Sequence, residues 1–89
     1  MSFTLKLTKN ALKDIETIKK SGNKATLKKL EILLQELIDH PETGTGQPEE
    51  LKYNFSGYWS RRLNSKDRLI YSIDNERSEV IVFQTKGHY

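Results

Sequence analysis

The sequence predicts an α+β fold in which a two-helix hairpin packs on a small, mainly antiparallel sheet, in the order β-α-α-β-β-β. Three observations lead to this prediction: a short alternating apolar stretch at the N-terminus, two stretches with helical periodicity, and three strand-like runs separated by short turns. Because short connections join antiparallel neighbours, the three C-terminal runs are expected to pair in sequence. The helices should then cover one face of that sheet.

The first strand and first helix are indicated by the spacing of apolar residues. Residues 3–7 alternate between apolar and polar side chains, which is the pattern of a half-buried strand. Apolar residues within 11–18 then recur at intervals of three and four, after Thr8 or Asn10, either of which can cap a helix. We expect this helix to end near Ser21–Gly22 and to expose a lysine-rich face.

A second helix and a long loop follow. The helix is expected to begin near Asn23, to bury an apolar stripe within residues 27–38, and to end before Pro41, because the residue before a proline avoids helical geometry. Residues 40–50 contain two prolines and two glycines, so they are expected to form a loop that leads Glu49 and Glu50 into the next strand.

The C-terminal half is expected to contain three strands. These are residues 51–63, interrupted at Ser56–Gly57, then residues 68–73, and finally residues 79–84. The residues between them are of the types that favour turns, which supports antiparallel pairing.

Length and composition restrict the kind of protein. At 89 residues and 10.4 kDa, residues 1–89 are expected to form a single domain with one modest core. The chain has no cysteine, which excludes disulfides and thiolate metal sites and favours a reducing compartment, so we expect a cytoplasmic protein. No run approaches the ~20 apolar residues of a membrane span, and no signal-peptide pattern is present, so no membrane partner is expected.

Positive charge is concentrated in one part of the chain. The net charge is +3. Residues 51–72 carry five basic residues, five aromatic residues and a single acid, Asp67. Arginine interleaved with aromatic side chains is typical of nucleic-acid-binding surfaces. A solvated hairpin face with its aromatic residues on the core side is the alternative interpretation.

Candidate catalytic groups remain after other sites are excluded. The two histidines lack metal-ligand spacing, and Gly44-x-Gly46 lacks the strand and helix of a phosphate-binding loop, so no metal site and no cofactor are expected. Glu49, Arg68 and His88 lie near strand ends that antiparallel pairing can bring together, subject to the register. A carboxylate, a guanidinium and an imidazole are the base, cation and acid that metal-free RNA cleavage needs. Taken singly, each also has an ordinary structural interpretation.

Motifs with nearly fixed spacing cover the C-terminal half. They are Pro41-x-x-Gly44-x-Gly46-x-Pro48-Glu49-x-Leu51-Lys52, Ser56-Gly57-Tyr58-Trp59-Ser60-Arg61-Arg62-Leu63, Arg68-Leu69-Ile70-Tyr71 and the terminal His88-Tyr89. With these motifs the chain resembles the Txe/YoeB toxins of the RelE superfamily. The resemblance implies a RelE-like fold and the toxin of a type II toxin–antitoxin system: a metal-independent endoribonuclease that cleaves mRNA in the ribosomal A site, inhibits translation, and is neutralised by a YefM/Phd-type antitoxin. It is also compatible with a homodimer.

The resemblance also implies roles for individual residues. Glu49 would be the general base, Arg68 would stabilise the transition-state charge, His88 would be the general acid, and Tyr89 would supply a supporting hydroxyl or a stacking ring. RNA, whether messenger or ribosomal, would be held by Lys52, Arg61 and Arg62.

Two departures from the family pattern carry expectations of their own. Escherichia-type relatives place an aromatic residue before the terminal pair and a proline after the glutamate, where this chain has Gly87 and Glu50. Gly87 is expected to loosen the segment that leads to His88, and Glu50 is a second carboxylate that competes with Glu49 for the role of base. A non-cleaving ribosome-binding protein and a gyrase-poisoning member of the same fold remain the alternatives to an enzyme.

Overall fold

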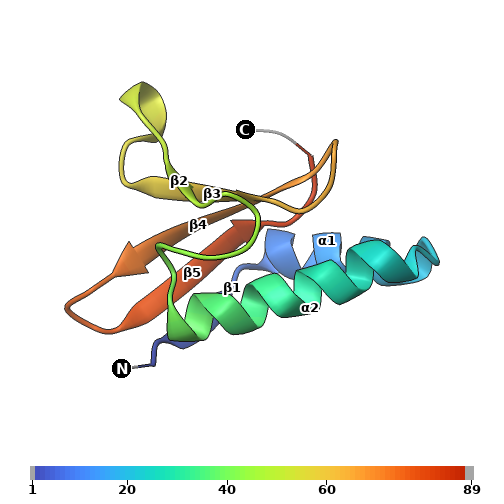
Figure 1. Cartoon of the computed structure of the whole chain (residues 1–89), viewed down its shortest axis with the longest axis horizontal. Coiled ribbons are helices and arrows are strands. Elements are labelled where there is room, and N and C mark those ends of the chain that lie inside the picture. The colour runs from blue at the N-terminus through green and yellow to red at the C-terminus, as the bar shows by residue number, and fades with distance from the viewer. Residues whose placement is uncertain (1, 88–89) are drawn as a thin grey trace.

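The fold consists of a five-stranded mixed sheet with two helices packed on one of its faces (Figure 1). The computed structural model describes residues 2–87. Its elements are β1 (Thr4–Leu7), α1 (Lys9–Lys20), α2 (Lys24–Asp39), β2 (Glu49–Glu50), the 3-10 turn η1 (Tyr53–Phe55), β3 (Tyr58–Arg62), β4 (Arg68–Asp74) and β5 (Glu79–Gln84). The predicted α+β class is confirmed, and the predicted order β-α-α-β-β-β gains one short strand, β2, ahead of β3.

The strand order in the sheet is β1-β5-β4-β3-β2. The strands from β2 to β5 pair antiparallel with their sequence neighbours, as predicted, while β1 pairs parallel with β5. The long connection that a parallel pair requires contains both helices and the strands β2 to β4. The sheet is therefore mainly antiparallel, and its most N-terminal strand lies beside its most C-terminal one.

Both helices begin at side-chain caps. Thr8 accepts a hydrogen bond from the amide of Ala11, and Asn23 accepts one from the amide of Thr26, so each cap satisfies a donor that the first turn leaves unpaired. The predicted start and end of each helix are confirmed. Their inner faces and the helix-facing side of the sheet form the core, which includes Ala11, Ile18, Leu30, Leu33, Leu37, Leu63, Leu69, Tyr71, Val80 and Val82.

The prediction of a strand over residues 51–55 is wrong. The amide of Leu51 donates to the carbonyl oxygen of Tyr58 at 2.8 Å, which closes the hairpin and leaves residues 52–57 as a loop. Within that loop Tyr53 adopts the left-handed region, with φ of 59°, and the amide of Phe55 donates to the carbonyl of Lys52 at 3.2 Å. In Figure 1 this loop protrudes from the sheet away from both helices.

Candidate active site

The register of the sheet brings Glu49 and Arg68 to one face. Glu49 is directly opposite Ser60, and Ser60 is opposite Ile70, two residues beyond Arg68 on β4. Opposed residues in antiparallel strands, and residues two apart along a strand, share a face. The guanidinium Nη1 of Arg68 also donates to Oγ of the buried Ser60 at 3.1 Å. Glu49 and Arg68 therefore flank Ser60 on the face opposite the helices.

The same register separates the two neighbouring carboxylates. Glu50 is opposite Trp59, whose ring stacks on the buried Tyr71 at 6.5 Å on the helix-facing side. Because side chains alternate along a strand, Glu50 belongs to the face opposite that of Glu49. Of the two carboxylates, Glu49 is the one that shares a face with Arg68.

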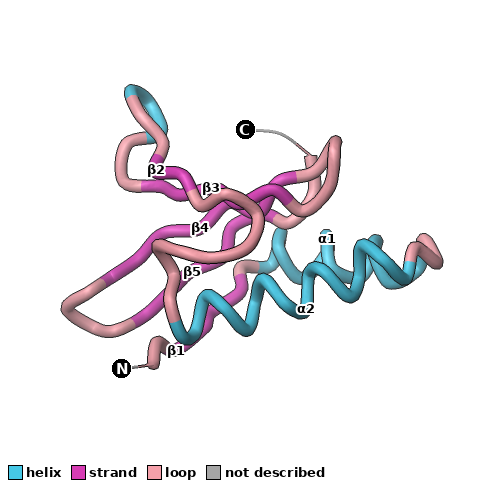
Figure 2. The backbone as a smooth tube through the Cα atoms, in the orientation of Figure 1, coloured by secondary structure: helices cyan, strands magenta, loops and turns pink. Residues whose placement is uncertain are grey.

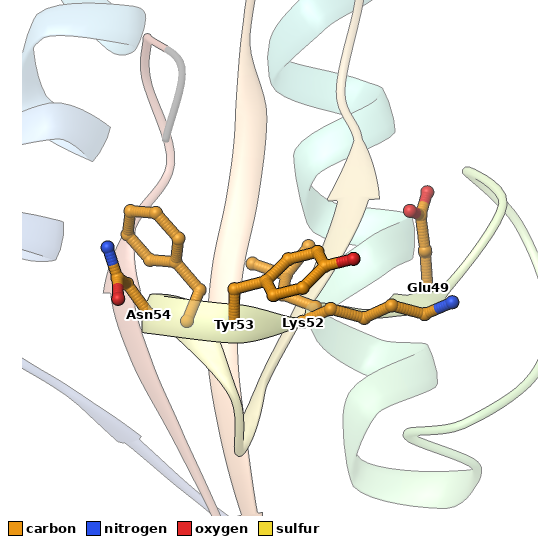
Figure 3. Close-up of a pocket in the computed structure, with 6 residues that line it drawn as sticks. Glu49, Lys52, Tyr53 and Asn54 are labelled. Carbon is orange, nitrogen blue, oxygen red and sulfur yellow. The ribbon is translucent and has the colours of Figure 1, made fainter.

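The loop after β2 adds a hollow beside Glu49. It has a volume of about 360 Å³ and is lined by Glu49, Leu51, Lys52, Tyr53, Asn54 and Phe55. In Figure 3 the side chain of Lys52 extends along the segment toward Glu49. Tyr53 is 92% exposed, and it adopts the left-handed region, which is uncommon for a non-glycine residue. The sequence identified aromatic residues here as a class but did not single out Tyr53.

Arg62 and Arg68 are directly opposed on β3 and β4. Arg62 is exposed, and both arginines line a second hollow of about 120 Å³ together with Asn64, Ser65 and Lys66. Three cationic side chains therefore gather at this end of the sheet face. Such a surface suits an anionic ligand, and Lys66 is a member of it that the motifs did not indicate.

Arg61 is placed differently from its expected role. Its side chain is fully buried, and its donors are taken by the carboxylate of Glu36 at 2.7 Å, by the hydroxyl of Tyr71 at 3.2 Å and by three loop carbonyls, those of His40, Thr43 and Thr45. A buried guanidinium whose donors are already hydrogen-bonded within the protein does not contact an RNA phosphate. The expected RNA contact of Arg61 is therefore a misassignment, because the side chain faces the helices rather than the open face.

Arg61 and its hydrogen-bond partners fix the loop that leads to Glu49, which Figure 2 draws in pink between α2 and β2. The Tyr71 hydroxyl donates to the carbonyl of Pro41 at 2.7 Å, and the amide of Arg62 donates to the carbonyl of Gly46 at 2.7 Å. A Cβ added at Gly46 would lie 2.8 Å from the carbonyl oxygen of Arg62. The loop thus lies directly against β3, and Glu49 follows Gly46 by three residues.

Electrostatics support the ionised state of this cluster. Burial acts to raise the pKa of Glu36, but hydrogen bonds from the hydroxyl and amide of Thr45 and the guanidinium of Arg61 outweigh it and hold that pKa below its usual value. Burial also raises the pKa of the Tyr71 phenol above its usual value. At neutral pH the cluster is a carboxylate–guanidinium pair beside a neutral phenol.

The chain after β5 returns to Arg68. The amide of Arg68 donates to the carbonyl of Gly87 at 3.0 Å, and the two segments run side by side in Figure 1. Gly87 has φ of 84°, in the left-handed region that glycine favours. His88 and Tyr89, the predicted acid and its neighbour, lie outside the described residues, so the predicted convergence of all three groups stays a prediction.

Comparison with known proteins shows the family of this chain. The family model described as "YoeB-like toxin of bacterial type II toxin-antitoxin system" matches residues 7–89. The chain belongs to the YoeB toxin family. It is therefore a toxin of a type II toxin–antitoxin system, a class in which YoeB- and RelE-type toxins are in general nucleases.

Individual relatives support the assignment. A YoeB toxin of Synechocystis is 40% identical over 68 residues, which are 76% of this chain and 77% of that protein. A YoeB/ParE toxin of Agrobacterium tumefaciens superposes with a TM-score of 0.87 at 29% identity, covering 98% of this chain and 100% of the other. The YoeB dimer of Staphylococcus aureus superposes with a TM-score of 0.83 at 30% identity and covers both chains fully. A YoeB–YefM complex from Staphylococcus aureus superposes with a TM-score of 0.81 at 31% identity. Within residues 2–87, neither helix has the length and apolar character needed to cross a bilayer.

Proposed function

We propose that this YoeB-family toxin is a ribosome-dependent mRNA endoribonuclease that acts in the ribosomal A site without a metal ion and so inhibits translation in the cytoplasm. We also propose that residues 1–89 are one toxin domain. The observation that carries the proposal is the placement of Glu49 and Arg68 on one open sheet face around Ser60. The segment that precedes His88 is hydrogen-bonded to the same Arg68.

The proposed reaction uses the substrate's own 2′-hydroxyl as nucleophile. Glu49 removes its proton, the 2′-oxygen forms a bond to the adjacent phosphorus, and Arg68 stabilises the negative charge that develops on the phosphoryl oxygens. As the bond from phosphorus to the 5′-oxygen breaks, His88 donates a proton to that oxygen, and Tyr89 supports this step. The products are a 2′,3′-cyclic phosphate and a 5′-hydroxyl end.

Groups around the open sheet face position the RNA substrate. Lys52 and Arg62 contact RNA phosphates, which predicts a salt-dependent affinity. The exposed ring of Tyr53 beside Glu49 provides a face on which a base can stack. Arg61 has no part in this contact, since it is buried under the loop.

The proposed regulation is occlusion by an antitoxin of the YefM/Phd type. The solved YoeB–YefM complex of S. aureus and its YoeB dimer support an antitoxin partner and a homodimer for this chain. An acidic or apolar antitoxin segment laid over Arg62 and Arg68 would cover the charge that RNA requires.

The test is primer-extension mapping of a defined message in a translating bacterial extract, with Glu49→Ala, His88→Ala and Glu50→Ala variants and with ribosome-free RNA. Glu50→Ala is the matched control, because it removes the neighbouring carboxylate from the opposite face. We expect cuts in A-site codons that require ribosomes, are lost with Glu49→Ala and His88→Ala, and persist with Glu50→Ala. Translation arrest without cuts would instead indicate ribosome binding alone, and an unaffected extract would direct attention to gyrase.

A further inference from the structure

We propose that Asp67 is a positioning residue that clamps the C-terminal segment against β4 and thereby fixes the point from which the chain continues to His88. The inference rests on the proposed function, because it concerns the group expected to act as general acid. Asp67 lies in the turn between β3 and β4, and it is not among the residues for which a catalytic or RNA-binding role is expected from the sequence.

The clamp holds one residue from two sides. Carboxylate oxygen Oδ1 of Asp67 accepts a hydrogen bond from the amide of Gly87 at 2.8 Å, and the amide of Arg68 donates to the carbonyl of Gly87 at 3.0 Å. Both backbone polar groups of Gly87 are thus bound by consecutive residues of the turn. The segment can neither slide along β4 nor turn over without breaking one of these bonds. Its position is therefore set relative to Arg68 itself.

Asp67 is itself held in place by Asn64. Its second carboxylate oxygen, Oδ2, accepts from Nδ2 of Asn64 at 2.9 Å, and its amide donates to Oδ1 of Asn64 at 2.7 Å. The carbonyl of Asp67 accepts from the amide of Leu63 at 3.0 Å. A carboxylate fixed at both oxygens and on both sides of its backbone is a rigid acceptor for Gly87.

A second carboxylate supports the same segment from the helix side. The amide of the buried Thr85 donates to Oδ2 of Asp14, on α1, at 3.1 Å. Asp14, Asp67 and Gly87 line one hollow together with Lys66 and Lys86. The segment is therefore docked at residues 85 and 87, two residues apart, by carboxylates that come from distant parts of the chain.

The charge of Asp67 is suited to this role. Burial acts to raise its pKa, but hydrogen bonds from Gly87 and Asn64 and the charges of Lys66 and Lys86 outweigh burial and lower the pKa below its usual value. The side chain is thus a carboxylate at neutral pH. Hydrogen bonds from an amide to an ionised acceptor are stronger than neutral ones.

A turn-capping role without consequence for catalysis is the competing explanation, and the chain supplies a matched control for it. Asp74 lies at the other end of β4, where its Oδ1 accepts from the amides of Glu76 at 3.0 Å and Arg77 at 3.1 Å. Asp74 is seven residues from Asp67, about 20 Å along an extended strand. Asp74→Ala removes comparable turn bonds without touching the C-terminal segment.

Amide hydrogen exchange tests the clamp without any assay of cleavage. In NMR experiments on the full-length toxin, Asp67→Ala should accelerate exchange of the Gly87 amide by at least about tenfold, the equivalent of one charge-assisted hydrogen bond. Asp74→Ala should leave Gly87 exchange unchanged. Asp67→Asn keeps an acceptor for Gly87 but loses the bond from Asn64, so it should give an intermediate rate. Unchanged Gly87 exchange in Asp67→Ala would overturn the proposal.

Single-turnover cleavage on programmed ribosomes tests whether Asp67 affects the action of the proposed general acid, His88. Asp67→Ala should lower the rate at saturating toxin by about tenfold or more and leave the half-saturating concentration within about twofold, since substrate binding is untouched. In a His88→Ala background, with the slow residual cleavage followed over long incubation, the same change should cause no further loss, because Asp67 acts through His88. An equal loss in both backgrounds, or a loss shared with Asp74→Ala, would overturn the positioning role. If the wild-type toxin does not cleave, the proposed function fails, whereas the exchange experiment still decides the clamp.

Discussion

Replacement of Arg61 by methionine is expected to destabilise the toxin strongly, although the residue lies in a motif that suggests RNA contact. Methionine fills much of the same volume with an unbranched chain, so the change removes mainly the charge and the hydrogen-bond donors. The guanidinium is fully buried and serves Glu36, the Tyr71 hydroxyl and three loop carbonyls. Glu36 keeps its two hydrogen bonds from Thr45, but a methionine offers no donor to the Tyr71 hydroxyl or to the loop carbonyls.

The magnitude follows from what is left unpaired. Breaking a buried ion pair from one side typically destabilises by about 3–5 kcal/mol, because the remaining charge loses its partner. The side chain of Glu36 is 19% exposed and can partly rehydrate, which lowers its share, while the loop carbonyls lose their donor as well. We therefore expect about 3–5 kcal/mol, a large part of the ~5–15 kcal/mol that stabilises a typical domain.

Urea unfolding followed by far-UV circular dichroism and tryptophan fluorescence measures this loss. Trp59 is the single tryptophan of the chain and stacks on Tyr71, so its fluorescence reports on the neighbourhood of the cluster. Arg62→Met is the matched control, since its side chain is exposed, and it should change stability by no more than about 0.5 kcal/mol. A loss below about 1 kcal/mol for Arg61→Met would refute the reasoning that the buried guanidinium holds the loop.

Four further predictions follow from the structure. The pKa values of Glu36 and Asp67 lie below their ordinary 4.5 and 3.8. The stability that these carboxylates contribute is therefore present at neutral pH and is lost as the pH falls through the lowered pKa values. Acid titration followed by circular dichroism should show a smaller loss of stability for Glu36→Gln than for the wild type. Tyr53→Ala should weaken ribosome binding by about 1–3 kcal/mol in a filter-binding assay, with an unchanged urea midpoint because the ring is 92% exposed. Arg62→Ala should reduce the slope of log affinity against log salt by about 1, whereas an unchanged slope would exclude a phosphate contact. Gly46→Ala should lower stability by about 1–3 kcal/mol, because the residue has φ of 86° and its added Cβ would meet the carbonyl of Arg62; wild-type stability would contradict that close approach.

The sequence predicts most of the elements because their signals are local. Caps at Thr8 and Asn23 and the proline at 41 define the helices, and turn residues separate β3, β4 and β5. The parallel pairing of β1 with β5 has no local signal, because it joins strands at opposite ends of the chain. The turn at residues 53–55 is not predicted from the sequence, because its aromatic residues are also typical of strands.

Arg61 shows what the alternation of side chains along a strand can and cannot predict about the site. Alternation along a strand puts Trp59 and Arg61 on one face and Arg62 on the other, so the sequence held a signal that the two arginines differ. Burial of Arg61, however, depends on loop carbonyls and on Glu36, which lies 25 positions away in the chain. The choice of Glu49 over Glu50 as the carboxylate beside Arg68 likewise required the register of β2 against β3.

We propose that Glu49 serves as the base in cleavage of ribosome-bound RNA. The most direct measurement is the chemistry of the new RNA ends on programmed ribosomes, in buffer containing a chelator, for the wild type, Glu49→Ala and Glu50→Ala. We expect 2′,3′-cyclic phosphate and 5′-hydroxyl ends from the wild type and Glu50→Ala, and no cleavage from Glu49→Ala. Ends carrying a 5′-phosphate, or undiminished cleavage by Glu49→Ala, would contradict the proposal.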